Sequence, residues 1–140
     1  MFGGHCIKTY SQTQETIALS SGESEFYGIV KAASVGLGMK SLLEDLGASV
    51  KVRVNTDSSA AKSISSRKGA GRVRHIEVRE LWVQEKVTRG ELAVAKVKGE
   101  DNVADGLTKH VDWAKMEKHM ALRGIRFARG RHEMSPHLGE

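Results

Sequence analysis

Four acidic residues lie in three separate short stretches that could bring carboxylates together. Glu23 and Glu25 stand two residues apart in "SSGESEFYG", Asp57 follows "VNT", and Asp105 lies in "DNVADGLTK". Carboxylates that converge from separate elements repel one another unless a hard divalent cation compensates them. Two such ions about 4 Å apart activate a water and stabilise the leaving oxygen in phosphodiester hydrolysis. Taken singly, the aspartates have simpler explanations: Asp57 as a helix N-cap and Asp105 as a solvated surface group.

The first third of the chain predicts two strands and a long helix that carries both glutamates. The runs 5–11 and 14–20 hold apolar residues on either side of a polar connection, which predicts a β-hairpin. Ser20 followed by Glu23 matches the S-x-x-E capping box. Apolar residues then recur at helical spacing, so the helix is expected to stop at Gly47. Both glutamates lie at flanks of the apolar stripe, and helical geometry alone does not choose between them.

Two further strands and four helices are predicted, and they would position the aspartates. The stretch "SVKVRVNTD" alternates valine with charged residues, as a strand does when one face is buried. Trp82 and Val83 are expected in the core, and Trp113 is expected to pack as well. The other elements are a short helix capped by Asp57, an amphipathic helix over 75–90, a strand over 91–98, and helices over 101–109 and 112–124. This order predicts a mixed α/β sheet with helical cover, whose active groups gather at the carboxyl ends of parallel strands.

Composition predicts a single domain with a basic surface that could bind a polyanionic partner. The 140 residues are 39% hydrophobic and 28% charged, which fits one globular domain over 1–124. The non-periodic basic stretch over 125–140 is expected to be a flexible tail. The formal charge of +5 suits a polyanionic partner better than a neutral one. A lone Cys6, with no signal peptide and no membrane span, predicts an intracellular protein without a disulfide or membrane contact.

Four blocks of the sequence together resemble one known domain. They are "ALSSGESEFYGIVKAA", "VRVNTDSSAAKSI", "RHIEVRELWVQEKVTRGEL" and "DNVADGLTK". In order and spacing they resemble the RNase H domain that ends the polyprotein of copia-like LTR retrotransposons, over roughly Gly3 to Arg123. The resemblance implies an RNase H-like α/β fold that hydrolyses the RNA strand of RNA/DNA hybrids by two-metal-ion catalysis. It also implies the hybrid and the reverse transcriptase region of the polyprotein as partners, in a cytoplasmic virus-like particle or the nucleus.

The resemblance also assigns roles to the acids. The family's catalytic glutamate directly precedes an aromatic residue, which is Glu25 before Phe26 here, and Glu23 is then the capping-box partner. The family's second and last aspartates match Asp57 and Asp105. These three acids are the implied ligands of two Mg²⁺ or Mn²⁺ ions in an intact domain. The side chains of Glu25 and Asp57 are therefore expected within about 4 to 8 Å of each other, with Asp105 approaching more loosely.

Two features of the family's pattern are absent from this sequence. The first catalytic aspartate of the family lies on an opening strand before the hairpin, whereas "MFGGHCIKTYS" resembles the second and third strands. The histidine that cellular members carry before the last aspartate has no counterpart in "VKGEDNVAD". Because the opening strand is central in this fold, its neighbours are expected to keep unpaired backbone groups. The chain alone is therefore expected to bind Mg²⁺ weakly, at a single site, and to be inactive.

Basic residues after the short helix could contact a nucleic acid backbone. Their cationic groups would neutralise phosphates, and neighbouring glycines would allow close approach. The candidates are Arg67, Lys68, Arg72 and Arg74 in the loop, with His75 and Arg79 from the matched block. A solvated charged loop explains the same residues without a ligand.

Three functions are compatible with the sequence. The first is the RNase H region described above. The second is a non-catalytic nucleic-acid-binding remnant of a retrotransposon polyprotein, in which the acids serve only as caps and surface groups. The third is another nuclease or integrase of the same fold class, since such folds carry three acids on comparable elements.

Overall fold

The computed structural model describes residues 1–69, 71, 76 and 78–125. Two compact units make up the chain. One is Gln12–Asn102, and the other combines Met1–Ser11 with Val103–Glu140. The predicted flexible tail, apart from its first residue, lies outside the described residues.

A parallel pair of strands forms the sheet of the 12–102 unit, within the expected α/β class. Strand β1 (Val52–Thr56) pairs with β2 (Leu92–Lys96) in a register that joins Val52 to Leu92 and Thr56 to Lys96. Both strands were predicted, and both are confirmed. The parallel direction places their carboxyl ends at the same edge, where the Val97 amide donates to the Thr56 carbonyl at 2.9 Å.

The other edge of β1 is open in the described part of the chain. The sheet there has only the two strands β1 and β2. The Thr56 carbonyl faces β2, and backbone groups alternate in direction along a strand. The amides and carbonyls of Arg53 and Asn55 therefore face away from β2. Among the described residues these groups form no hydrogen bond, which agrees with the unpaired ladder groups expected from the sequence.

Helix α1 (Ser21–Asp45) begins and ends as its sequence predicts. The Ser20 hydroxyl oxygen accepts from the Glu23 amide at 3.2 Å. The chain leaves the helix through Gly47, whose φ of +83° suits a residue without a side chain. Phe26 and Ala33 are fully buried on the face turned toward the sheet, in one core with Val54 of β1.

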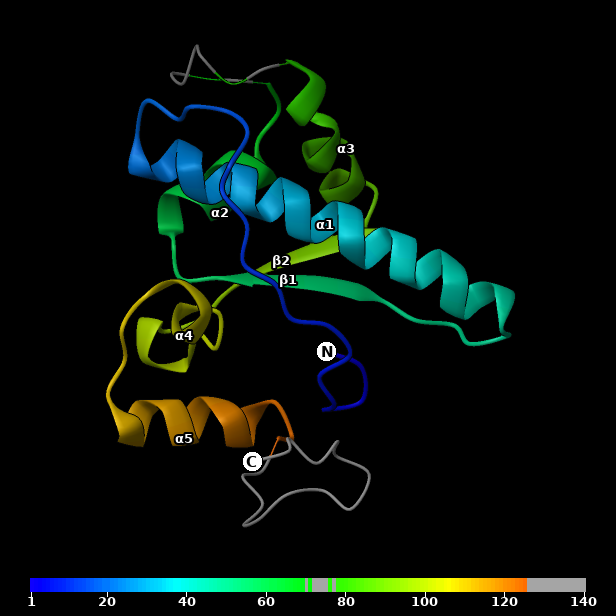
Figure 1. Cartoon of the computed structure of the whole chain (residues 1–140). Helices are drawn as coiled ribbons and strands as arrows, with labels where there is room; N and C mark the ends of the chain where they lie inside the picture. The colour runs from blue at the N-terminus through cyan, green and yellow to red at the C-terminus, as the bar shows by residue number, and fades with distance from the viewer. Residues whose placement is uncertain (70, 72–75, 77, 126–140) are drawn as a thin grey trace, which may run out of the picture. The chain divides into compact units, whose positions relative to one another are not determined.

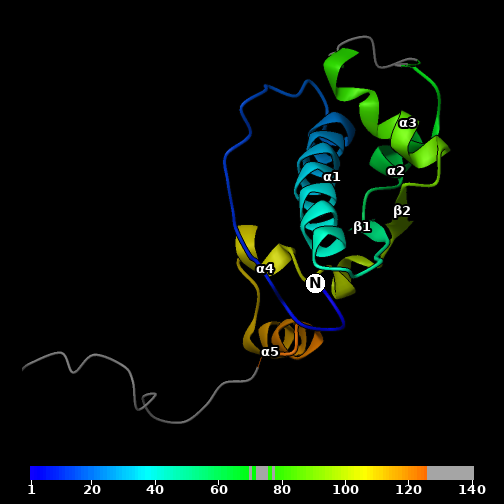
Figure 2. The same cartoon turned by 90° about the vertical axis from the view of Figure 1, so that its right-hand side faces the viewer.

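In the described part of the connection from β1 to β2, short helices lie on the side of the sheet that α1 covers (Figures 1 and 2). They are α2 (Ser59–Ser66), the 3₁₀ helix η1 (Val78–Glu80) and α3 (Trp82–Thr88). Val83 is fully buried and Trp82 packs against the core, as expected. A further 3₁₀ turn, η2 (Gly99–Asp101), follows β2.

The predicted hairpin over 5–11 and 14–20 is wrong. Neither run is a strand; among the described residues, an isolated bridge joins Phe2 to His5, the first residue of the run 5–11. Ile17 is 87% exposed and Leu19 is 65% exposed, so the alternating apolar residues of the second run are not buried. A two-stranded ribbon without a neighbouring strand or a covered face is marginal in water, which explains why the propensity alone does not form it.

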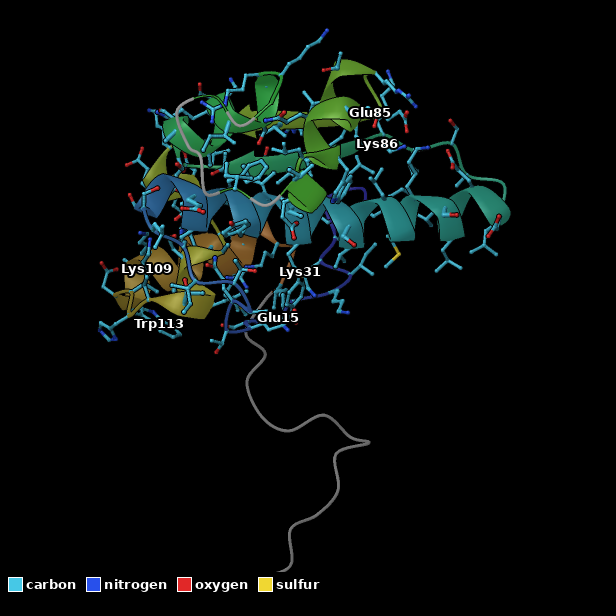
Figure 3. The ribbon with its side chains drawn as sticks, turned by 90° about the horizontal axis from the view of Figure 1, so that it is seen from above. Glu15, Lys31, Glu85, Lys86, Lys109 and Trp113 are labelled. Carbon is cyan, nitrogen blue, oxygen red and sulfur yellow. The ribbon has the colours of Figure 1, made fainter. Side chains whose placement is uncertain are left out.

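The described part of the second unit contains the helices α4 (Asp105–Thr108) and α5 (Trp113–Leu122). Asp112 caps α5 by accepting from the Lys115 amide at 2.8 Å. The guanidinium of Arg123 is buried and donates to the carbonyls of His119 and Val103. The expectation that Trp113 packs is wrong: it opens α5 with 63% of its surface exposed (Figure 3). At a first helical position it lies outside the face that buries His119.

No helix among the described residues combines the length and apolar character needed to cross a membrane.

The packing of α1 on β1 depends on a missing side chain at Gly36. A Cβ at this position would stand 2.8 Å from Cγ1 of Val52, which is too close for a stiff β-branched side chain to accommodate. At Gly38, two residues further along the same helix, nothing lies within 4 Å. We expect Gly36→Ala to lower the free energy of unfolding by about 1–3 kcal/mol. Gly38→Ala should raise it by about 1 kcal/mol, because alanine favours helix.

Urea unfolding followed by circular dichroism measures both changes. Equal stabilisation by the two substitutions would show that α1 does not approach β1 this closely.

Candidate functional site

Asp57 lies directly after β1, at the edge where the carboxyl ends of both strands meet. The sequence predicted that it caps the following helix, and this is wrong. The cap of α2 is Ser58, whose hydroxyl oxygen accepts from the Ala61 amide at 3.1 Å. The Thr56 hydroxyl oxygen in turn accepts from the Ser58 amide at 3.1 Å. The half-buried Asp57 carboxylate forms no hydrogen bond or ion pair with any described residue. It therefore takes no part in capping α2.

Glycine at position 99 leaves room beside this carboxylate. A Cβ built on Gly99, the first residue of η2, would lie 3.7 Å from Oδ2 of Asp57. The turn after β2 therefore comes into contact range of the carboxylate that follows β1. The side chain of Asp57 is held at an edge formed by both strands.

The two glutamates at the start of α1 have opposite environments. Glu23 is only 1% exposed, and its carboxylate accepts from the Leu19 amide at 2.9 Å and from the Tyr27 hydroxyl at 3.0 Å. The side-chain bond of the capping box thus reaches Leu19, one residue before the cap. Glu25 is exposed on the same helix. Of the two, Glu25 is the carboxylate that solvent and ligands can reach.

Asp105 begins α4 in the other unit and does not lie on a solvated face as the sequence suggested. It is buried, with its side chain 11% exposed, and its Oδ1 lies 3.1 Å from Nζ of Lys109. Its Oδ2 lies 3.7 Å from Nζ of Lys115. Two ammonium groups therefore compensate this carboxylate.

The described residues contain no group of three His, Cys, Asp or Glu side chains that could hold a metal ion. The expected separation of Glu25 and Asp57, and the approach of Asp105 to them, stay predictions. The structure gives each carboxylate a distinct setting: exposed on α1, half-buried after β1, and paired with lysines in α4.

The basic loop after α2 is described in part. Arg67 is half-buried and Lys68 is exposed. The remaining candidates Arg72, Arg74 and His75 lie outside the described residues, as does the side chain of Arg79.

Sequence analysis missed the residue that holds this loop. Gln84 of α3 is buried, and its side-chain amide donates to the carbonyls of Ile64 at 2.9 Å and Gly69 at 3.0 Å. Its oxygen accepts from the Gly69 amide at 2.7 Å. A polar residue next to the core residue Val83 was the available signal, since a buried amide needs partners.

Replacing each glutamate with alanine tests the difference in burial between Glu23 and Glu25. We expect Glu23→Ala to lower the free energy of unfolding by about 1–3 kcal/mol, because it removes the acceptor of two part-buried or buried donors. Glu25→Ala should change it by less than about 1 kcal/mol, as for exposed charges. Thermal and chemical unfolding of both variants checks this, and equal losses would contradict the different burial of the two side chains.

The capping assignment at the end of β1 is tested separately. Ser58→Ala should cost about 1 kcal/mol of stability, because it removes the N-cap acceptor of α2. Asp57→Ala should cost clearly less, since its carboxylate has no donor among the described residues. If urea unfolding shows that Asp57→Ala loses more stability than Ser58→Ala, Asp57 and not Ser58 caps α2.

Comparison with known proteins gives one significant relative among curated sequences. No protein-family model matches the chain, and no solved structure matches it significantly. The relative is the retrovirus-related Pol polyprotein from transposon TNT 1-94 of Nicotiana tabacum, which is 33% identical over 126 residues. The match covers 89% of this chain but 10% of the polyprotein, so the chain spans about a tenth of that relative's length. The chain is therefore similar, over most of its length, to one segment of a retrotransposon Pol polyprotein.

Proposed function

We propose that this chain is the RNase H region of a copia-like retrotransposon Pol polyprotein and contributes to hydrolysis of the RNA strand in RNA/DNA hybrids. The observation that carries the proposal is the Asp57 carboxylate. It follows β1 at the shared carboxyl edge of two parallel strands, is half-buried, and is left free by Ser58, which caps α2 instead. Catalytic groups of open α/β sheets gather at this kind of edge. The similarity to a Pol polyprotein supports the same assignment.

The described residues do not fit a complete two-ion site. Two divalent cations need several carboxylates around a shared position, and no group of three possible ligands occurs in the part of the chain that the structure describes. Asp105 is compensated by lysines, so a cation would have to displace Lys109 and Lys115 from it. Activity in this proposal therefore requires a further segment of the polyprotein. The segment would place a strand along the open edge at Arg53 and Asn55 and supply another carboxylate.

A second candidate function is a non-catalytic remnant that binds nucleic acid. It is favoured by the lysine pairs of Asp105, which give that carboxylate a structural role without any metal. The two candidates differ in one measurable property, cleavage of a hybrid by the extended protein.

Cleavage by a fused protein tests the proposal. We expect this chain alone to leave an RNA/DNA hybrid intact with Mg²⁺ or Mn²⁺, and fusion to its native upstream segment to give cleavage of the RNA strand. In the fused protein, Asp57→Asn should abolish turnover while leaving the fold intact, and Glu25→Gln should do the same. The readout is release of labelled RNA from a hybrid of mixed sequence.

Glu23→Gln serves as the matched control for Glu25→Gln, because it changes the same charge two residues away on the same helix. It should retain turnover at temperatures where the variant remains folded. A cooperatively folded fusion that leaves the hybrid intact across metal titrations would favour the non-catalytic remnant. So would an Asp57→Asn variant that cuts as well as its parent.

A further inference from the structure

We infer that the exposed face of α2, with Lys96 beside it and the turn that follows it, binds the phosphate backbone of nucleic acid. Naming nucleic acid as the partner rests on the proposed function. Lys68 was already a candidate from the sequence, whereas the face of α2 and Lys96 are assigned by neither the sequence resemblance nor the catalytic proposal.

One face of α2 is polar and exposed along its whole length. Ala61, Ile64 and Ser65 are buried on the inner side. The outer side presents hydroxyl and ammonium groups at Ser59, Lys62, Ser63 and Ser66, all of them exposed. At 100° per residue these four positions fall within about one third of the helix circumference. Serine hydroxyls and lysine ammonium groups are common partners of backbone phosphates.

Lys96 of β2 extends this face. Its ammonium group donates a hydrogen bond to the Ser59 hydroxyl, at the first turn of α2. The side chain is thereby directed from the sheet edge onto the helix. Since Ser59 directly follows the cap residue Ser58, the extended face begins two residues from Asp57.

The three lysines of this surface have no acidic partner among the described residues. In the described part of the chain, Lys62, Lys68 and Lys96 form no ion pair. A polyanion could therefore bind them without displacing a carboxylate.

Helix α3 shows the opposite arrangement. Lys86 pairs with Glu91 and Arg89 pairs with Glu85, each at 2.5 Å; Figure 3 labels Glu85 and Lys86 on this helix. The hydrogen bond from Lys86 also lowers the pKa of the Glu91 carboxyl. Lys86 and Arg89 thus have acidic partners, whereas Lys62, Lys68 and Lys96 form no ion pair in the described part of the chain.

Gln84 positions Lys68 relative to α2. The buried amide of Gln84 bonds the Ile64 carbonyl in the last turn of α2 and both backbone groups of Gly69, the neighbour of Lys68. The turn is thus fixed to the helix end without any contribution from Lys68 itself. A cation held on a fixed turn loses less conformational freedom on binding than one on a loose loop. Gln84 is a positioning residue in this proposal.

Salt-dependent binding of an RNA/DNA hybrid tests the surface. The full chain is titrated against a labelled hybrid of mixed sequence between about 50 and 200 mM NaCl. Combining Lys62→Gln, Lys68→Gln and Lys96→Gln should weaken binding about tenfold or more at the lowest salt. The slope of log affinity against log salt should fall by about one for each lysine. A second hybrid of different sequence should show the same losses.

The control variant removes equal charge from paired residues. It combines Lys40→Gln, Lys86→Gln and Arg89→Gln, whose partners are Glu44, Glu91 and Glu85. Its salt slope should stay near that of the parent. Equal losses in both variants would show that net charge alone drives binding and would overturn the α2 surface. An unchanged affinity and slope in the first variant would overturn it too.

Gln84→Met tests the positioning role, since methionine keeps the volume but not the hydrogen bonds. It should reduce affinity as much as Lys68→Gln, and combining the two should add little further loss. Additive losses would mean that Gln84 acts only through general stability, and thermal unfolding monitors that stability. If Gln84→Met does not fold, the variants of the exposed lysines still test whether the α2 surface binds the hybrid.

Two outcomes separate this inference from the proposed function. If the lysine variant loses hybrid binding and the fused protein does not cleave the hybrid, the α2 binding surface is supported and the proposed nuclease function is rejected. Vesicles of anionic phospholipid are the second probe. If the lysine substitutions weaken binding to vesicles but not to the hybrid, the assignment to nucleic acid is wrong.

Discussion

The parallel pairing of β1 with β2 is the interaction on which the arrangement of the 12–102 unit depends. Parallel neighbours need a crossover between them, and α2, η1 and α3 supply it on the face that α1 also covers. The same pairing brings the turn at Gly99 beside Asp57, although 42 positions separate them in the chain numbering. Local capping by Ser58 then leaves the Asp57 carboxylate available. Sheet geometry and one hydroxyl group together create the setting of the candidate catalytic residue.

The charged residues of the crossover are also distributed unevenly between α2 and α3. Glu85 and Lys86 of α3 form ion pairs with Arg89 and Glu91 just beyond the helix, whereas α2 carries serines and Lys62, which has no ion pair among the described residues. Gln84 joins these two helices through backbone groups and not through charge. The contact between α2 and α3 can therefore persist at high ionic strength, while attraction of a polyanion to α2 falls with salt.

Local signals predicted α1 and both strands of the sheet, because a cap, a terminal glycine and an alternating valine pattern act over a few residues. It was less predictable which of two nearby residues would take a given position, such as a helix cap or a buried site. Asp57 and Ser58 are both good caps, and only the folded backbone shows that Ser58 has the right position. Glu23 and Glu25 both lie at flanks of the apolar stripe, yet the fold buries one and exposes the other. The hairpin failed because strand propensity needs a partner that the described sheet does not provide. The role of Gln84 depends on a loop fifteen residues away.

The open edge of β1 also bears on self-association. A strand with unpaired backbone groups is a template on which another copy of the chain can add, and proteins discourage such growth with charged residues on the edge strand. β1 is only five residues long, and Arg53 stands within it with its side chain exposed. Two copies meeting edge to edge would bring their guanidinium groups close together, where like charges repel. An exposed arginine on a short edge strand is the kind of charged residue that discourages such pairing.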